Sequence, residues 1–264
     1  MSQLLLEIFS EEIPARMQQG AARDLERMFA DRLKAAGLTW EAMMPYAGPR
    51  RLTLVVEGLP TSTPARSEEI KGPKASAPEQ ALDGFLRKTG LTREQLIERD
   101  GVLFAIQSSK GRLATDVISE IVDDVVRNFP WPKSMRWESG SLRWVRPIKR
   151  IVCLFGGEVV PVEIDGIVSG NVTEGHRFLG SGRPLTVRDF ADYRDQLEAN
   201  FVLLDAADRR ARILEQARNV CQASGLELVE DEGLLTEVTG LAEWPTSILG
   251  DMDPSFLDLP PEVI

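Results

Sequence analysis

The residues with the clearest chemical potential lie together in residues 129–150. This segment contains six lysine and arginine side chains and three tryptophans, with one acidic residue among them. Guanidinium groups can bind phosphate in a bidentate manner, and indole rings can stack on unpaired bases. The composition therefore indicates an RNA-contacting region. The alternative is that the tryptophans anchor a core while the arginines pair with carboxylates of this protein or with another subunit. The candidate contact residues are Lys133, Arg136, Trp137, Arg143 and Arg146.

Five further residues complete the set of candidates for RNA contact. Arg50 and Arg51 stand at the start of a predicted strand, where we expect a surface ion pair from one and a ligand contact from the other. Lys71 lies in a predicted loop, where phosphate contact and ordinary solvation both remain open. His176 with Arg177 fits a catalytic base, an RNA contact or a structural hydrogen bond. Because no second catalytic partner is visible, a structural or binding role is favoured for His176.

No recognisable catalytic motif accompanies these residues. The sequence contains no Walker A loop, no dinucleotide-binding glycine fingerprint, no nucleophile elbow and no zinc-protease histidine pair. With a single histidine and two distant cysteines, Cys153 and Cys221, we predict no metal site and two free buried thiols. The acidic runs are typical of solvated helix ends. We therefore assign no catalytic residue, and no cofactor, to this chain.

The overall charge restricts the kind of nucleic-acid binding that is available. The formal net charge is −10, so long-range repulsion disfavours indiscriminate binding and leaves only a local basic face. The apolar fraction of 43% is ordinary for a globular protein. No apolar run approaches the roughly 20 residues that span a bilayer, and the N-terminus lacks the features of a signal peptide. We predict a cytoplasmic protein without a membrane segment.

The elements that must position these residues follow from hydrophobic periodicity. The first half predicts strands over 4–8, 52–56 and 102–107, and long helices over 14–36 and 114–125. Residues 60–78 lack apolar periodicity and predict a long exposed loop. A short helix over 81–86 is followed by a capping box that begins at Thr92 and ends at Gln95. Strands over 151–155 and 159–164 are joined by a hairpin turn at Gly156 and Gly157.

These elements indicate an α+β fold with a mixed or antiparallel sheet and packed helices, followed by a mainly helical C-terminal part. We expect an α+β accessory domain over residues 1–182 and a mainly helical segment over residues 183–264. Helices are predicted after the caps at Asp189 and Asp205. The final residues, 257–264, read as the first turn of an apolar helix, so we expect a chain truncated at its C-terminal end.

The same residues carry a resemblance to a known family. The sequence resembles the N-terminal part of the beta subunit of the bacterial two-subunit glycyl-tRNA synthetase. The matching stretches occur in the family's order and cover essentially the whole chain: Leu4–Ile8, Glu11–Ala15, Gly48–Leu52, Lys71–Pro73, Pro132–Trp137, Val145–Ile148, Gly170–Thr173, Gly175–Phe178 and Glu243–Pro245. The chain departs from the family pattern at Phe9-Ser10 and Lys149-Arg150, which puts individual contacts in doubt but not the resemblance.

The resemblance implies an α2β2 enzyme that charges tRNA(Gly) with glycine. It places ATP and magnesium at a site of the alpha subunit, so the partners implied for this chain are that subunit, tRNA and a second beta subunit. The region is similar in kind to the B3/B4 region of phenylalanyl-tRNA synthetase beta chains. Our first hypothesis is a non-catalytic module for tRNA binding and assembly. The alternatives are a purely structural subunit-docking module and, less favoured, a hydrolytic proofreading pocket.

Overall fold

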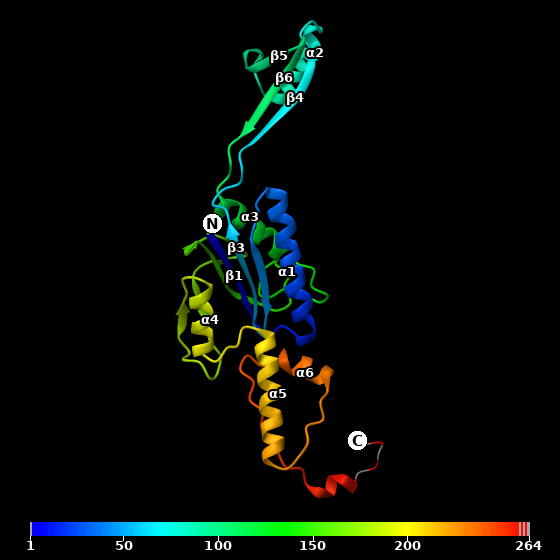
Figure 1. Ribbon diagram of the computed structural model, residues 1–264, viewed down its shortest axis with the longest axis vertical. Helices are drawn as coiled ribbons and strands as arrows, with labels where there is room; N and C mark the ends of the chain where they lie inside the picture. Colours follow the sequence, from blue (N-terminus) through cyan, green and yellow to red (C-terminus); the bar gives the residue numbers. More distant parts are fainter. Residues whose placement is uncertain (1, 259, 261, 263–264) are drawn as a thin grey trace.

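A five-stranded antiparallel sheet forms the centre of the protein. The computed structural model describes residues 2–258, 260 and 262. The strand order is β2-β3-β1-β7-β8 (Figure 1). β1 pairs with both β3 and β7, so its apolar run lies in the middle of the sheet and is buried on both faces. The strands are β1 (Ser2–Ser10), β2 (Ala42–Ala47), β3 (Arg51–Leu59), β7 (Ile148–Phe155) and β8 (Glu158–Val159).

Two helices, α1 (Ala15–Ala36) and α3 (Ala114–Arg127), cover one face of this sheet (Figure 1). Their apolar stripes, which include Leu25 and Val122, pack with side chains such as Leu6 into the main core. α1 follows Pro14, whose fixed φ suits the start of a helix, and a left-handed glycine ends it. The helices predicted over 14–36 and 114–125 are confirmed, and the sheet is antiparallel within the predicted α+β class.

The opposite face of the sheet is covered by α4 (Phe190–Ala199), whose Tyr193 packs with Leu5 and Val152 in a second core. A short hairpin, β11 (Val172–Glu174) with β12 (Pro184–Thr186), lies next to it. These contacts cross the domain boundary that the sequence suggests after residue 182. That boundary stays a prediction.

A small subdomain, which we call the head (residues 66–109), projects from one end of the sheet (Figure 1). The loop predicted over 60–78 is wrong for residues 66–74, which form a strand. Hydrogen bonding to β6, rather than apolar periodicity, defines that strand. The capping box of Thr92 and Gln95 is confirmed. The head comprises β4 (Arg66–Lys74), α2 (Glu79–Thr89), the 3-10 helix η1 (Arg93–Gln95), β5 (Leu96–Arg99) and β6 (Val102–Ser109).

The strand predicted over 159–164 is interrupted. β8 ends at Val159, and β9 (Glu163–Ile164) begins only after Pro161, which has no backbone N–H to donate to a ladder. β9 instead pairs with β10 (Ile167–Val168) in a two-stranded hairpin. The turn at Gly156 and Gly157 is confirmed, and both residues have positive φ, of 61° and 88°.

Three further elements follow α4: α5 (Ala206–Ala223), α6 (Glu232–Thr239) and the 3-10 helix η2 (Pro254–Asp258). The expectation of a mainly helical C-terminal part is not confirmed, since residues 224–231 and 240–253 contain no helix. The predicted cap of α5 is present: Asp205 Oδ1 accepts a 2.8 Å hydrogen bond from the Ala207 amide. Half of the residues in the helix expected over 257–264 lie outside those described.

Candidate functional site

An irregular basic loop, residues 129–147, connects α3 to β7 and holds most of the predicted RNA contacts. Its base is aromatic. The Phe129 and Trp131 ring centroids lie 4.7 Å apart, and Trp144 lies 5.0 Å from Trp131 in an edge-to-face arrangement. Main-chain hydrogen bonds between Met135 and Trp144, 2.8 and 3.2 Å long, close the loop. The basic loop therefore has an apolar base, formed by these aromatic side chains.

The tryptophans of this loop mainly form its apolar base. Trp144 is fully buried in the main core, and Trp131 and Trp137 are half-buried and pack against the same core. Of the two readings of the tryptophans, base stacking or anchoring of a core, the second therefore holds for Trp144. The physical reason is that large aromatic side chains gain most from burial. Base stacking by Trp137 stays a prediction.

The six cations of residues 129–150 fall into two groups, four in the basic loop and two at the start of β7. Lys133, Arg136 and Arg143 are exposed and Arg146 is half-buried, and within the described part of the chain none of the four forms an ion pair. Arg143 Nε donates to Ser134 Oγ over 3.2 Å, which leaves the rest of its guanidinium group available. The other two cations of the segment are neutralised by acids: Lys149 pairs with Glu11 and Arg150 with Glu174.

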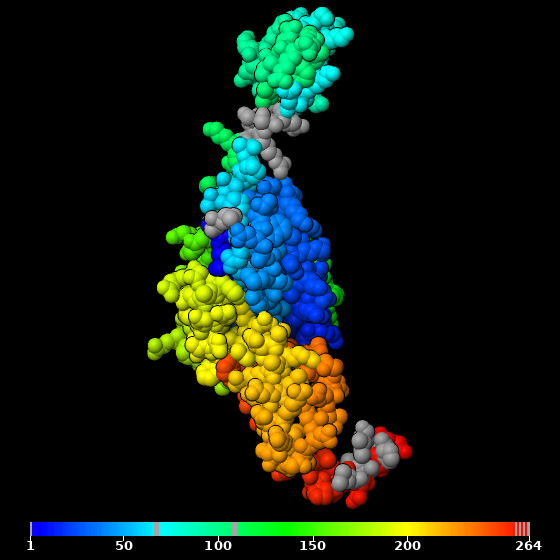
Figure 2. All heavy atoms as spheres, in the orientation of Figure 1, coloured from blue at the N-terminus to red at the C-terminus, as the bar shows by residue number. Residues whose placement is uncertain are grey.

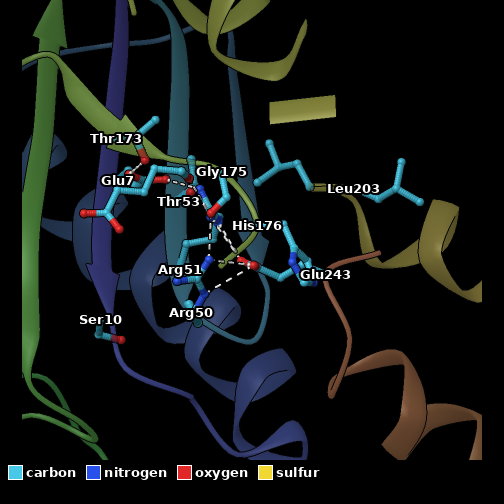
Figure 3. A network of polar contacts seen from close by, with 12 residues as sticks. Glu7, Ser10, Arg50, Arg51, Thr53, Thr173, Gly175, His176, Leu203 and Glu243 are labelled. Carbon is cyan, nitrogen blue, oxygen red and sulfur yellow. Dashed lines mark hydrogen bonds and ion pairs between the residues drawn. The ribbon is translucent and has the colours of Figure 1, made fainter. Parts of the chain in front are cut away.

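Arg50 and Arg51 occupy a different setting from the one expected. Both are buried, and the carboxylate of Glu243 lies between them, 2.9 Å from Arg50 Nη2 and 3.0 Å from Arg51 Nη2 (Figure 3). Arg51 Nη1 also contacts Glu7 Oε2 at 2.9 Å. The predicted surface ion pair is therefore wrong, because the ion pairs of both residues are buried. A ligand contact from either residue stays a prediction. A buried guanidinium group needs partners for its charge and its N–H groups, and here carboxylates from β1 and from the segment after α6 supply them.

A buried polar network continues from Glu7, on the central strand, to α4. The carboxylate of Glu7 accepts hydrogen bonds from Thr173 and from the Tyr193 hydroxyl, and Tyr193 lies 3.1 Å from Thr53 Oγ1. Burial, followed by the charge of Glu7, raises the pKa of Tyr193 well above its ordinary value, so the phenol stays protonated as a donor. Every oxygen of Glu7 therefore has a partner inside the protein, as a buried carboxylate requires.

The positive charges of Arg50 and Arg51 favour the ionised form of Glu243. Burial raises the pKa of Glu243, but the charges of Arg51 and Arg50 outweigh burial and lower the pKa below its ordinary value. Arg51 also donates to the Glu174 carbonyl, and Arg50 to the Gly175 carbonyl over 2.8 Å. The network therefore joins β1, β3, the strand β11 and the segment after α6. Its role is to hold these elements together.

A third buried arginine, Arg209 of α5, has no carboxylate partner among the described residues. Its guanidinium group donates to four main-chain carbonyls, at Ala47, Leu203, Leu204 and Thr239, over 2.8 to 3.0 Å. Burial lowers the pKa of Arg209 to about 10. These bonds fix the start of α5 and the end of α6 against β2.

His176 forms a rigid turn with the residues that follow it. Its Nδ1 accepts hydrogen bonds from the Phe178 and Leu179 amides, both over 3.1 Å, so the remaining proton lies on Nε2. Partial burial, with the charges of Arg50 and Arg51, lowers the pKa of the imidazole below 6.5. The neutral ring thus acts as a structural acceptor. Of the structural and binding roles expected for His176, the structure shows the structural hydrogen bonding, and an RNA contact stays a prediction.

Arg177 is exposed but is not a free cation. It pairs with Glu11 and with Glu12, the latter over 3.0 Å, and Lys149 approaches the same Glu11. Hydrogen bonding to Lys149, reinforced by Arg177, lowers the pKa of Glu11 to about 2. Arg177 therefore lies in a compensated cluster apart from the unpaired cations of the basic loop. Its contact with RNA stays a prediction.

Lys71 lies on β4 of the head, exposed and without an ion pair in the described residues.

The ten candidate residues for RNA contact therefore lie in several separate parts of the structure. The basic loop holds Lys133, Arg136, Trp137, Arg143 and Arg146, the head holds Lys71, and the buried network and the turn above it hold Arg50, Arg51, His176 and Arg177.

The sequence interpretation missed two residues of the buried network and one buried arginine. Glu7 interrupts an otherwise apolar strand, and a charge at a fully buried strand position signals a paired carboxylate. Glu243 was noticed only as part of a family stretch. Arg209 lies in a helix rich in exposed polar residues, and no local pattern distinguishes it from its neighbour Arg210.

A cavity of about 450 Å³ lies between α1, β2, α5 and α6. Its lining includes Tyr46, Gln18, Arg209 and Arg210, but Arg209 and Gln18 are already hydrogen-bonded to main-chain carbonyls.

Over the described ranges no group of three histidine, cysteine or acidic side chains is arranged to hold a metal ion, and no helix is long and apolar enough to cross a membrane. Burial raises the pKa of Cys153 to about 12, which keeps this thiol protonated.

Comparison with known proteins agrees with this chain's motifs. A sequence model of the family described as glycyl-tRNA synthetase beta subunit matches residues 4–264. Curated proteins named glycine–tRNA ligase beta subunit are similar over the whole chain, at 61% identity in Phenylobacterium zucineum (strain HLK1), 53% in Ruegeria sp. (strain TM1040) and 53% in Dinoroseobacter shibae (strain DSM 16493 / NCIMB 14021 / DFL 12). The chain spans 38 to 40% of the length of these relatives. It belongs to the glycyl-tRNA synthetase beta-subunit family.

Proposed function

We propose that this chain contributes, as part of a glycine–tRNA ligase beta subunit, to the binding and positioning of tRNA for ATP-dependent glycylation. Family membership supports the enzyme class, since the relatives are named for this ligase. The observation that carries the RNA-binding role is the basic loop. It presents Lys133, Arg136 and Arg143 to solvent without acidic partners in the described chain.

The physical argument rests on local rather than total charge. Residues 129–150 hold six cations and one acid, whereas the chain has a net charge of −10. At physiological ionic strength the Debye length is about 8 Å, so a phosphate at the loop interacts mainly with the loop. The unpaired guanidinium groups of the loop can bind this phosphate directly, because no ion pair with a carboxylate has to be broken first.

We assign the glycine-activation chemistry, with its ATP and magnesium, to the alpha subunit. The family resemblance supports this division, and the sequence of this chain contains no Walker A loop or other nucleotide-binding glycine motif. The proposed partners are the alpha subunit, tRNA(Gly) and a second beta subunit in an α2β2 assembly in the cytoplasm.

The test replaces two exposed loop arginines, Arg136→Ala with Arg143→Ala, in the full-length beta subunit bound to its alpha partner. We expect the Kd for tRNA to rise roughly tenfold at moderate salt, since two phosphate contacts are removed. The matched control is Arg27→Ala with Arg188→Ala, which removes the same charge from residues paired within their own helices or helix caps. Fluorescence anisotropy with labelled tRNA measures both. Equal affinities for the two variants would refute the proposal.

A structural docking role is the second candidate, and one observation favours it. Several apolar side chains in residues 226–256 are mostly exposed, among them Val229 and Ile248. Exposed apolar groups of this kind are typical of protein interfaces. Under this alternative, polar substitution of Val229 and Ile248 would weaken assembly with the alpha subunit, and the arginine variant above would leave tRNA affinity unchanged. Size-exclusion chromatography with light scattering measures the assembly.

A further inference from the structure

The head is an insertion with a closed base. It lies between β3 and α3, and an antiparallel bridge between Ser62 and Leu113 joins the two chains that enter and leave it. The Thr63 amide donates to the Arg112 carbonyl over 2.9 Å, and the Ala114 amide to the Thr61 carbonyl over 2.9 Å. Figure 1 shows the head beyond the end of the sheet, and in Figure 2 it stands apart from the rest of the molecule.

The head has its own small core. Leu82 and Phe85 of α2 are buried, as is Ala105 at the centre of its sheet. Phe85 packs over Gly72, where an added Cβ would lie 2.5 Å from the phenyl ring. The strand order β4-β6-β5 places β6 in the middle, with continuous antiparallel pairing to β4 except at one irregularity. The head is therefore held in shape by contacts within residues 66–109.

The head lacks the acidic excess of the rest of the chain. Residues 66–109 contain seven lysines and arginines and seven acids, a net charge of 0 in a chain of −10. Arg99 pairs with Glu69 on the sheet. Five further cations of the head are exposed and form no ion pair with any described residue: Lys71, Lys74, Arg87, Lys88 and Arg93.

Distance separates these cations from the acidic body. β4 has nine residues, which at about 3.3 Å per residue gives a strand of about 30 Å. That length is several times the Debye length of about 8 Å. The repulsion that the body exerts on a polyanion is therefore largely screened at Lys74, at the far end of the strand. Binding there depends on the unpaired cations of the head itself.

The open face of the head sheet adds a stacking surface. Lys71, Phe104 and Ile97 are direct neighbours across the three strands, and Ala105, the next residue of β6, is buried on the opposite face. Phe104 is half-buried, with the Arg99 guanidinium 5.8 Å from its ring centroid. An aromatic side chain on an open sheet, flanked by cations, is the arrangement by which several small domains stack unpaired bases and hold the adjoining phosphates.

We propose that the head is a second RNA-binding element of the beta subunit, which contacts the tRNA backbone through its unpaired cations and an unpaired base through Phe104. This inference rests on the proposed function and adds a separate contact to it. A protein partner is the weaker reading of this face. Its exposed apolar side chains are few, with Ile97 at 39% and Ile106 at 36% exposure, and charged groups border them.

Two variants of the full-length beta subunit, each bound to its alpha partner, test the head. The first replaces residues 64–111 by Asn-Gly, because the hydrogen-bonded pair of Thr63 and Arg112 is spaced for a two-residue hairpin turn. The second keeps the head and removes three of its cations, Lys71→Gln, Lys88→Gln and Arg93→Gln. Its control removes three paired cations from the body: Arg27→Gln, Arg188→Gln and Arg218→Gln.

We expect both head variants to raise the Kd for labelled tRNA about tenfold or more. The plot of log K against log salt should become shallower by roughly two for the triple variant, while the control changes neither quantity. Wild-type affinity and slope in both head variants would overturn the inference. Loss of alpha-subunit assembly with unchanged tRNA affinity would overturn it as well, in favour of a protein contact. The variant Arg136→Ala with Arg143→Ala, measured in parallel, tests the proposed role of the basic loop. Its result therefore separates failure of that proposal from failure of the inference about the head.

Discussion

Two kinds of arginine occur in this chain, and their surroundings give them different roles. Arg51 is 1% exposed and lies between two carboxylates, whereas Arg136 and Arg143 are exposed and lack acidic partners among the described residues. The residue type is the same, so the sequence could not separate them. Burial and pairing decide which guanidinium group stabilises the fold and which remains available to phosphate.

Removal of the Glu243 carboxylate should expose the energetic role of the buried network. Glu243→Ala leaves Arg50 without a carboxylate partner and Arg51 with Glu7 alone, so we expect the free energy of unfolding to fall by about 3–5 kcal/mol. Urea denaturation followed by circular dichroism measures the change. Glu237→Ala, an exposed position on α6, serves as the control and should alter stability by less than about 0.5 kcal/mol. Similar curves for both variants would contradict the network's structural role.

The imidazole of His176 should titrate below its ordinary pKa of 6.5, because partial burial and two nearby arginines disfavour its charged form. The hydrogen bonds of this turn need the neutral imidazole, so protonation of His176 destabilises the folded state. Their contribution to stability is fully present above pH 6.5 and is lost as the pH falls through the folded-state pKa. His176 is the only histidine, so its NMR signals in this 264-residue chain need no separate assignment. A pKa at or above 6.5, or a proton on Nδ1, would contradict the turn geometry.

At the scale of elements, periodicity located the helices well and the strands unevenly. α1, α3 and the capped start of α5 were predicted because an apolar stripe or a side-chain cap lies within each segment. β4 was missed, because its partner β6 follows more than 25 residues later and its own sequence is polar. Interruption of the strand at Pro161 could have been anticipated, since proline cannot donate to a ladder.

Two glycines of the head provide a paired prediction about this element. Gly72→Ala places a Cβ 2.5 Å from the Phe85 ring and 2.9 Å from the Leu103 carbonyl, so we expect a loss of about 1–3 kcal/mol in head stability. Gly84→Ala on α2 meets no atom within 4 Å and should stabilise the helix by about 0.5–1 kcal/mol. Hydrogen exchange of the β6 amides reports both. Faster exchange in Gly84→Ala, or unchanged exchange in Gly72→Ala, would argue against the packing described for the head.

At the scale of the whole molecule, charge is distributed unevenly. The acidic body supplies the net charge of −10, while the basic loop and the head carry unpaired cations. The loop could be predicted because its residues are contiguous in sequence. The network of Glu7, Arg51 and Glu243 could not be assembled from local patterns, because its members come from positions up to 236 residues apart, as the separation between Glu7 and Glu243 shows.

The salt dependence of tRNA binding tests the central claim most directly, because that claim concerns cations free to release counterions from phosphate. In the full-length beta subunit bound to its alpha partner, log K should fall linearly with log salt. For Arg136→Ala with Arg143→Ala we predict a slope shallower by about one to two than that of the unmodified protein. An identical slope for the two proteins would show that these arginines do not meet tRNA, and would contradict the account.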